Sequence, residues 1–512
     1  MSHKNYRPWT PEQDYLIPPR PRDWLPEGHL TYFILDVVAQ LDLRRIEAVI
    51  QAKDPRGTVP YHPRMMVALL LYAYATGTYS SRRIARATFD DVAVRFIAGD
   101  SHPHFDTIAA FRQVHLDALG ALFVQAVQMC QAAGLVKLGH LSLDGTKILA
   151  NASKHAAMSY ERMKADEVRI QNEIQALLER AKQADDVEDA QLGPGQDVVD
   201  VPAELQRRES RLAKIQEAKR ALEGDAHRHR AAELREMANT HDETAADERL
   251  PARQRKTVRT LARTQREKAD ELDPPDGPPT AGGSADAGLP AHQTPALADG
   301  SPTAKSQRNF TDPDSRIMVA HGEYVQAYNA QVLVDGDSQV IVEAVVSNQA
   351  PDVEYLVPVV QRAMERGLKA TTMTADTGYM STKNLDWCQN NGIDAYISMA
   401  RQRHSEVPAA VVTRRDPLAV AEPSSEPERP PPTSRERMVA KLATPEGRKI
   451  YARRKTIAEP VFGQIKEARR FRRFSLRGLW KVASEWSLVC AVHNLLKLFS
   501  SKQKNIALSV AG

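Results

Sequence analysis

Residues 329–346 read NAQVLVDGDSQVIVEAVV, two apolar runs separated by a short polar segment. The runs Asn329–Val334 and Gln339–Val346 are rich in valine, which favours strands. The segment Asp335–Ser338 between them combines aspartate, glycine and serine, the residues of a tight turn. This stretch therefore predicts a β-hairpin in the second half of the chain.

The segments around this hairpin alternate between strand and helix patterns. A strand is predicted before it, over Val136–Leu143, and it runs into Asp144-Gly145. After the hairpin the pattern predicts a helix over Val353–Arg366, a strand over Ala370–Ala375, a helix over Thr382–Asn390, a strand over Ala395–Met399 and a helical tail over 446–500. This order indicates an α/β fold with a mixed sheet of ribonuclease-H type, in which the first and fourth strands are neighbours.

The remaining segments surround and interrupt this core. Helical apolar spacing before residue 135, with arginines at 82, 83 and 86, fits either a DNA-binding helical module or a small bundle with solvated arginines. Apolar residues repeat at heptad-like spacing on both sides of Gly193-Pro194-Gly195, which predicts a coiled-coil-like helical hairpin. The expected domains are 1–135, helical; 136–156, 306–400 and 441–500, the core; 157–272, the helical hairpin; 273–305, a flexible linker; and 401–440, a polar and partly disordered insertion.

Composition sets limits on the class of protein. The formal net charge is only +4, and 42% of the 512 residues are hydrophobic, enough for a sizeable core. The three cysteines are scattered singly, which is typical of a reducing compartment. Neither a signal peptide nor an apolar run of about 20 residues is visible, so we expect a soluble, intracellular protein that does not enter a membrane.

Three acidic residues occupy positions suited to catalysis. Asp144 and Asp376 follow predicted strands, and Glu459 lies in the helical tail. Carboxylates at strand ends cluster where ligands bind, and neighbouring carboxylates favour a cation such as Mg²⁺ or Mn²⁺ between them. Two ions about 4 Å apart would suit phosphodiester chemistry. Each residue also has a structural explanation: a turn at Asp144, a cap at Asp376, and a first-turn acid at Glu459, where Pro460 must start or kink a helix.

A basic stretch surrounds Glu459. From Arg448 to Lys481 there are twelve lysines and arginines and only two acids, with aromatic residues between them. A solvated helix face normally mixes charges, so this excess indicates contact with nucleic acid. Lys466 lies seven residues after Glu459, which places both on one face of a continuous helix. Lys466, Arg469, Arg470 and Arg473 are expected to line a groove that leads to the carboxylates.

The blocks LSLDGTKILANAS, TDPDSRIM, YNAQVLVD, TADTGYMS and YARRKTIAEPVFGQIK, with an N-terminal block beginning PRMMVALLLYAYATG, resemble those of bacterial insertion-sequence transposases of the DDE class, close to the insertion-sequence 1182 family. The resemblance covers most of the chain outside the two insertions. It implies metal-dependent cleavage at the ends of a mobile element followed by strand transfer into target DNA.

The same resemblance assigns roles to individual residues. It makes Asp144, Asp376 and Glu459 a catalytic, metal-binding triad for two Mg²⁺ or Mn²⁺ ions. Its DNA contacts are Tyr451, Lys466, and either Arg454 or Lys455, because each of these two satisfies one half of the family spacing. The implied partners are the element ends, target DNA and a second copy of the chain, in the nucleoid-associated cytoplasm of a bacterium. A nuclease without strand transfer, or a catalytically inactive or domesticated DNA-binding protein, are the alternatives.

Overall fold

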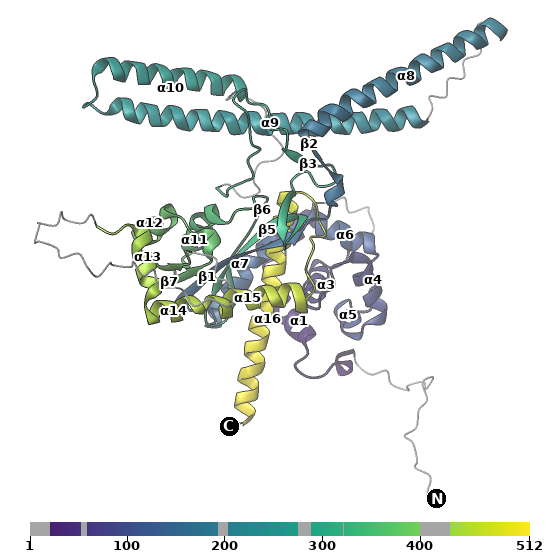
Figure 1. Ribbon diagram of the computed structural model, residues 1–512. Helices are drawn as coiled ribbons and strands as arrows, with labels where there is room; N and C mark the ends of the chain where they lie inside the picture. Colours follow the sequence, from purple (N-terminus) through teal and green to yellow (C-terminus); the bar gives the residue numbers. More distant parts are fainter. Residues whose placement is uncertain are drawn as a thin grey trace, which may run out of the picture. The chain divides into compact units, whose positions relative to one another are not determined.

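The computed structural model describes residues 21–52, 59–192, 203–274, 288–320, 322–399 and 431–511. The chain divides into two compact units, which we describe separately. The first consists of Met1–Met129 and Ala491–Gly512, and the second of Cys130–Cys490. Figure 1 shows a helical N-terminal region and a sheet that carries long helical arms.

The described part of the first unit is helical, as predicted. Its core is built around the apolar helix that begins at Pro63, in which Val67 and Leu70 are fully buried. Arg82, Arg83 and Arg86 lie exposed on the helix that begins at Ser81. The helices are α1 (Leu30–Gln40), α2 (Arg44–Gln51), α3 (Pro63–Ala75), α4 (Ser81–Asp90), α5 (Val92–Ile97), α6 (Phe105–Val114), most of α7 (Leu116–Ala132) and the end of α16 (Leu479–Ala511).

The second unit contains a six-stranded mixed sheet. Its path is β4-β5-β1-β7-β8, and β6 pairs with the remaining part of the long strand β5. The β5–β6 hairpin is the one predicted from residues 329–346, and β1 and β7, the first and fourth predicted strands, are neighbours. The strands are β1 (His140–Leu149), β4 (Arg316–Ala320), β5 (Glu323–Asp335), β6 (Ile341–Ser347), β7 (Thr372–Ala375) and β8 (Asp394–Ile397). This is an α/β fold with a ribonuclease-H-like mixed core.

Helices flank this sheet and refine one prediction. The helices α11 (Leu356–Glu365) and α12 (Thr382–Asn390) match the predicted ones closely. The helical tail predicted over 446–500 is not one helix but is broken into separate segments. These are α13 (Ser434–Ala443), α14 (Pro445–Ala452), α15 (Arg454–Gly463), a π-helical turn (Gln464–Ala468), a non-helical stretch and α16.

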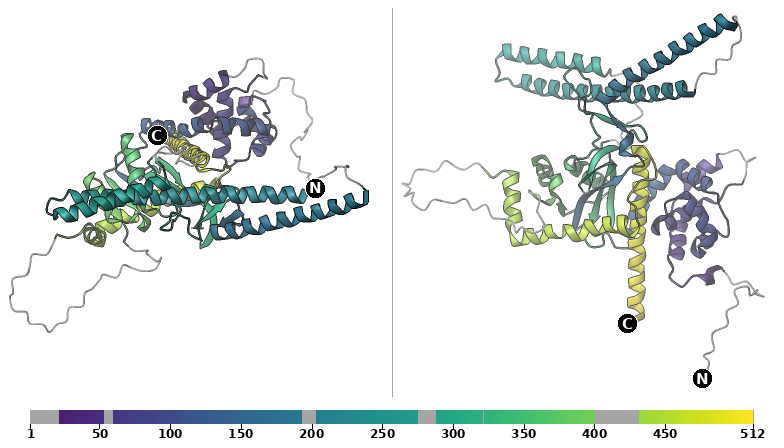
Figure 2. Two further views of the ribbon diagram at one scale, coloured as in Figure 1. Left: turned by 90° about the horizontal axis from the view of Figure 1, so that it is seen from above. Right: turned by 45° about the vertical axis from the view of Figure 1, so that its right-hand side comes forward.

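The described part of the helical insertion contains three helices rather than one hairpin. They are α8 (Tyr160–Leu192), α9 (Ala203–Ala246) and α10 (Ala252–Leu272), and α9 pairs with α8 along its first half and with α10 along its second (Figure 2). The heptad-like positions Met163 and Ile170 of α8 pack against Ile215 and Leu222 of α9, as their spacing predicts. A short antiparallel pair, β2 (Ala157–Ser159) with β3 (Gln307–Asn309), stands at the base and was not predicted.

The predicted linker and the second insertion are described only in part. Residues 275–287 and 400–430 lie outside the described residues. Within 288–305, Thr294 is buried and its carbonyl is 3.0 Å from His229 Nδ1 of α9, so this part of the predicted linker is packed. Similarly, α13 begins at Ser434, inside the predicted polar insertion. Within the described residues, no helix is long and apolar enough to cross a membrane.

Candidate active site

Asp144 lies inside β1 and not at the end of a strand. Asp144 and Gly145 pair with Val332 and Gln331 of β5, so the turn interpretation of Asp144-Gly145 was wrong. The strand continues because β5 is long enough to pair with β1 as far as Leu149. The parallel pairing of β1 with β7 does end here, at Leu143 opposite Ala375.

Asp376 follows that last pair on β7. Asp144 and Asp376 are therefore the next residues on two neighbouring parallel strands, whose backbones lie about 4.8 Å apart. The Asp376 side chain caps the short 3₁₀ turn that follows, since its Oδ1 accepts a hydrogen bond of 2.8 Å from Gly378 N. Asp376 therefore caps the following turn, as its alternative explanation predicted, through one of its two carboxylate oxygens.

Glu459 projects from α15, and its side chain is about half exposed. Pro460 does not start a helix, because α15 runs from Arg454 through Pro460 to Gly463. A proline at 460 leaves the carbonyl of Thr456 without its usual helical donor. Gln339 Nε2, from the β5–β6 turn, donates to that carbonyl at 2.9 Å and replaces the lost hydrogen bond.

A single guanidinium lies between two of the three acids. Arg454 Nη1 is 3.2 Å from Asp144 Oδ2, and Arg454 Nη2 is 3.2 Å from Glu459 Oε1. Only 16% of the Arg454 side chain is exposed, and its Nε is buried without a hydrogen-bond partner among the described residues. The neighbouring Lys455 is exposed. Of the two candidates left open by the sequence, Arg454 is the one that contacts the acids.

Burial dominates the electrostatics of this cluster. Burial raises the pKa of Asp144 to about 7, although the Arg454 guanidinium opposes this shift. Burial also raises the pKa of Asp376, and the nearby Asp352 adds to the effect. A buried carboxyl with a raised pKa takes up a positive charge readily, because a cation offsets its lost hydration. The Arg454 guanidinium does not fully offset the effect of burial on these carboxyls, so the cluster is suited to binding a stronger cation.

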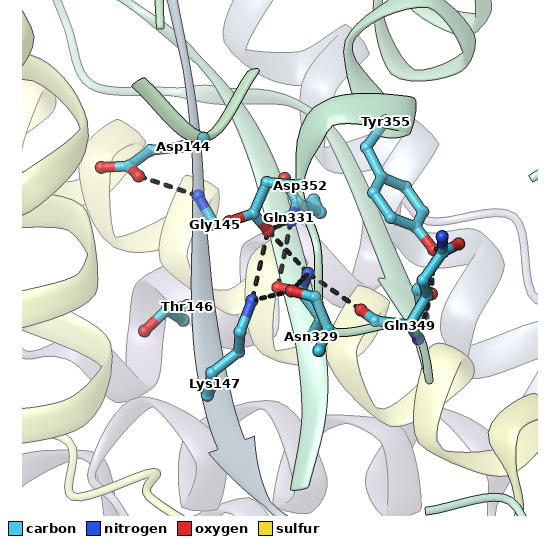
Figure 3. A network of polar contacts seen from close by, with 12 residues as sticks. Asp144, Gly145, Thr146, Lys147, Asn329, Gln331, Gln349, Asp352 and Tyr355 are labelled. Atoms are coloured by element: carbon cyan, nitrogen blue, oxygen red, sulfur yellow. Dashed lines mark hydrogen bonds and ion pairs between the residues drawn. The ribbon is translucent and has the colours of Figure 1, made fainter. Parts of the chain in front are cut away.

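Asp352 belongs to a polar network that the sequence did not predict. Its Oδ1 accepts hydrogen bonds from Asn329 Nδ2 at 2.6 Å and Gln331 Nε2 at 2.7 Å, and it pairs with Lys147 Nζ at 3.2 Å. Figure 3 shows these side chains of β1 and β5 converging on Asp352. A Cβ on Gly378 would meet Asp376 Oδ1 at 3.0 Å and Asp352 Oδ2 at 3.2 Å, so the two carboxylates flank Gly378.

Two features of the sequence are informative about this network in retrospect. Asp352 follows a predicted strand at a short distance, as Asp376 does. Asn329 and Gln331 are polar residues at alternate positions of the otherwise apolar run 329–334, and both are fully buried. Buried amides require hydrogen-bond partners, which Asp352 supplies.

The residues predicted to contact DNA differ in their exposure to solvent. Lys466 is half-buried, and its Nζ donates to Thr146 Oγ1 and, at 3.1 Å, to the carbonyl of Lys147. Burial lowers the pKa of Lys466. Lys466 lies within the π-helical turn Gln464–Ala468, so it and Glu459 do not lie on one continuous α-helix. Lys466 nevertheless reaches β1 two residues beyond Asp144.

The basic loop after the π-helical turn contains one residue that was assigned wrongly. Arg469 is only 5% exposed, and its Nη1 donates to the carbonyl of Val489 at 3.2 Å. It is held inside the protein by backbone carbonyls and cannot line an exposed groove. Arg470 and Arg473 are exposed, and Arg473 forms a bridge with Leu149 at the end of β1. Tyr451 is half-buried in α14 and interacts electrostatically with Arg454.

The donor set fits Mg²⁺ or Mn²⁺ in its chemistry. Carboxylate oxygens are the ligands that these ions prefer. Among the described residues no three side chains of the types His, Cys, Asp and Glu are gathered closely enough to hold a metal ion. The guanidinium of Arg454 already lies between the carboxylates of Asp144 and Glu459, and it supplies the positive charge that this pair requires.

Comparison with known proteins identifies two segments. Residues 292–495 match the family model of the transposase DDE domain, and residues 19–114 match that of a transposase domain, DUF772. The first range includes Asp352, Asp376, Arg454 and Glu459, whereas Asp144 precedes it. The search of curated proteins and the search of solved structures found no match.

Proposed function

Because its two domains mark the chain as an insertion-sequence DDE transposase, we propose that it cuts DNA at the ends of its mobile element and joins the freed ends to target DNA. The pairing of these two domains is consistent with the insertion-sequence 1182 family. The proposal rests on one observation: the carboxylates of Asp144 and Glu459 both contact the Arg454 guanidinium, beside Asp376.

Asp144, Asp376 and Glu459 are the residues that would hold two Mg²⁺ or Mn²⁺ ions. When bound, such ions activate the attacking oxygen and stabilise the leaving oxygen of a phosphodiester. Asp144 is fixed by its place in β1, and Asp376 by its hydrogen bond from Gly378 N. Glu459 is the exposed member of the set, so it would close the site from the solvent side.

The surrounding cations would position the DNA. A phosphate backbone approaches three carboxylates only if positive groups offset their repulsion. Lys466 beside Thr146, together with Arg454 and the exposed Arg470 and Arg473, supplies such groups. The exposed Arg82 and Arg83 of α4 make the N-terminal unit a candidate for recognising element ends. Two copies of the chain in the active complex would hold the two ends.

Single substitutions of the triad test this function. Asp144→Asn, Asp376→Asn and Glu459→Gln should each abolish metal-dependent cleavage of a duplex that carries an element end. Binding of that duplex should be retained, because none of these residues supplies a positive charge. A precleaved end then tests joining. Cleavage without joining would identify a nuclease, and full activity in all three variants would refute the assignment.

A further inference from the structure

One half of the insertion carries a strongly basic surface. Between Ala252 and Arg266, α10 contains six lysines and arginines and no acidic residue. Four of these define what we call the α10 basic face: Arg253, Lys256, Arg259 and Arg263, all exposed. Their spacing of three, three and four residues places them on one side of the helix over about 15 Å.

The basic face points away from the packing interface of α10. Ala262 and Ala269 are fully buried, and Ala269 packs with Ala231 and Leu234 of α9. The α10 basic face lies roughly 60° to 180° around the helix from Ala262, at 100° per residue. Packing against α9 therefore leaves these four side chains toward solvent.

The basic face is not neutralised by the chain itself. Arg263 makes one exposed ion pair with Glu267 at 3.5 Å. Arg253, Lys256 and Arg259 make no ion pair with any residue that the structure describes. The first turn of α10 has no acid, although the positive end of a helix favours acids over bases. Like charges at this spacing also repel one another.

The other half of the same insertion follows the opposite pattern. Between α8 and α9, Arg208 pairs with Glu173 at 3.0 Å and Lys219 pairs with Glu167 at 2.7 Å. Arg169 lies between Asp166 and Glu173 on α8. Solvated helices normally pair charges in this way. The α10 basic face, with three of its four cations unpaired among the described residues, is thus a local feature and not a general property of the insertion.

We propose that the α10 basic face binds the phosphate backbone of duplex DNA, away from the site of cleavage. This inference rests on the proposed function in one respect, that DNA is the substrate. About 15 Å of duplex carries roughly nine phosphate charges, which matches a row of cations of that length. The helix contains no aromatic residue for stacking on unpaired bases, but exposes Thr257, Thr260 and Thr264 between the cations. Contact of this kind is independent of DNA sequence.

The test removes the four charges from the full-length protein. A variant with Arg253→Gln, Lys256→Gln, Arg259→Gln and Arg263→Gln keeps residues that favour helices. The probe is a 40-base-pair duplex of mixed sequence without element ends, and its affinity is measured by fluorescence anisotropy over a range of salt concentrations. The slope of log affinity against log salt should become shallower by about three units for three to four lost phosphate contacts.

A matched variant controls for the loss of charge. Arg169→Gln, Arg208→Gln, Arg211→Gln and Lys219→Gln together remove four cations that are paired on the α8–α9 hairpin. This variant should keep the wild-type slope, and circular dichroism should show that both variants retain their helices. If the salt slope of the α10 variant is the same as that of the control variant, the proposal is overturned. It is also overturned by an α10 variant that binds duplex normally but loses self-association in size-exclusion chromatography, because the face would then bind protein.

The outcome is separable from that of the proposed function. Cleavage of an element end at saturating DNA should remain within about twofold of wild type in the α10 variant, since α10 packs mainly against α9, which carries none of the triad. If the wild-type protein fails to cleave but the α10 variant loses salt-dependent binding, the transposase assignment fails and this inference stands. If cleavage occurs but the salt slope of the α10 variant is unchanged, this inference fails and the transposase assignment stands.

Discussion

Arg454 lies 3.2 Å from the buried carboxylate of Asp144, one of the side chains that would hold a metal ion in the proposed function. The same guanidinium reaches Glu459, so it holds two of the three acids together. Its buried Nε has no hydrogen-bond partner among the described residues, which makes this position costly to maintain. An arrangement of this kind favours release of the arginine once a stronger cation is present.

Replacing Arg454 should therefore strengthen metal binding while weakening DNA binding. In Arg454→Met the carboxylates lose their competing cation, so Mn²⁺ affinity without DNA should rise roughly tenfold, the equivalent of one charged hydrogen bond. Electron paramagnetic resonance of Mn²⁺ measures this directly. Arg454→Lys keeps the charge and should lie between wild type and Arg454→Met. Weaker Mn²⁺ binding in Arg454→Met would mean that the arginine organises the acids and does not compete with the ion.

Gly145 should tolerate no side chain, because the Asp352 network occupies the space beside it. A Cβ at Gly145 would lie 2.5 Å from Gln331 Nε2 and 3.1 Å from Asp352 Oδ1. Gln331 is fully buried and cannot move without breaking its hydrogen bonds. Gly145→Ala should lower the free energy of unfolding by about 1–3 kcal/mol, the usual cost of overpacking, as measured by urea denaturation. Gly139→Ala is the control, because nothing lies within 4 Å of its Cβ position.

His140 predicts how stability depends on pH. Its ring is 3.1 Å from Thr374 Oγ1 across the β1–β7 pair, and burial lowers its pKa to about 4 from 6.5. Between these values the unfolded chain binds a proton that the folded chain does not, so stability falls as pH decreases. The loss attributable to His140 should reach about 2 kcal/mol at pH 5 relative to pH 8. His140→Gln should lose this part of the pH dependence, and an unchanged profile would show that His140 takes up its proton at the same pH in the folded and the unfolded protein.

Gln339 and Pro460 should be energetically coupled. Gln339→Asn shortens the side chain that donates to Thr456 and should cost up to about 1 kcal/mol of the free energy of unfolding. Asparagine suits the φ of 61° at this position, so backbone strain does not confuse the comparison. Pro460→Ala restores the helical donor, so the part of the Gln339→Asn effect that comes from Thr456 should vanish, whereas the part that comes from Gln464, whose Nε2 donates to Gln339 Oε1 at 3.3 Å, should remain. Additive effects in the double variant would show that the two residues act separately.

The parts of the fold that the sequence predicted well are those with local signals. The hairpin over residues 329–346 has apolar strands on both sides of a turn, and α12 has the predicted bounds 382–390. The length of β1 could not be predicted in the same way. Asp144-Gly145 resembles a turn locally, and only the partner strand β5 keeps it extended.

The candidate site was likewise predictable only in part from local signals in the sequence. Asp144 and Asp376 became candidates because acids after predicted strands are visible in a sequence, and Glu459 because it lies in a basic helical stretch; their catalytic role stays a prediction. Which of Arg454 and Lys455 contacts them was not visible, because one residue turns a helix by about 100° and the phase of α15 depends on its packing. Arg469 was assigned wrongly for a similar reason, since composition does not distinguish an inward arginine from an outward one.

The long insertion between β1 and its partner strands also affects how the protein is made. Asp144 pairs with β5 about 190 residues later in the chain, and Leu143 pairs with β7 about 230 residues later. At about 5–20 residues per second, a ribosome needs roughly 10–40 s to deliver β5 after β1. The α9–α10 hairpin is local and can form in that interval, whereas β1 has no partner. Until β5 and β7 emerge, the nascent chain therefore displays an unpaired strand edge, which is the form most exposed to aggregation.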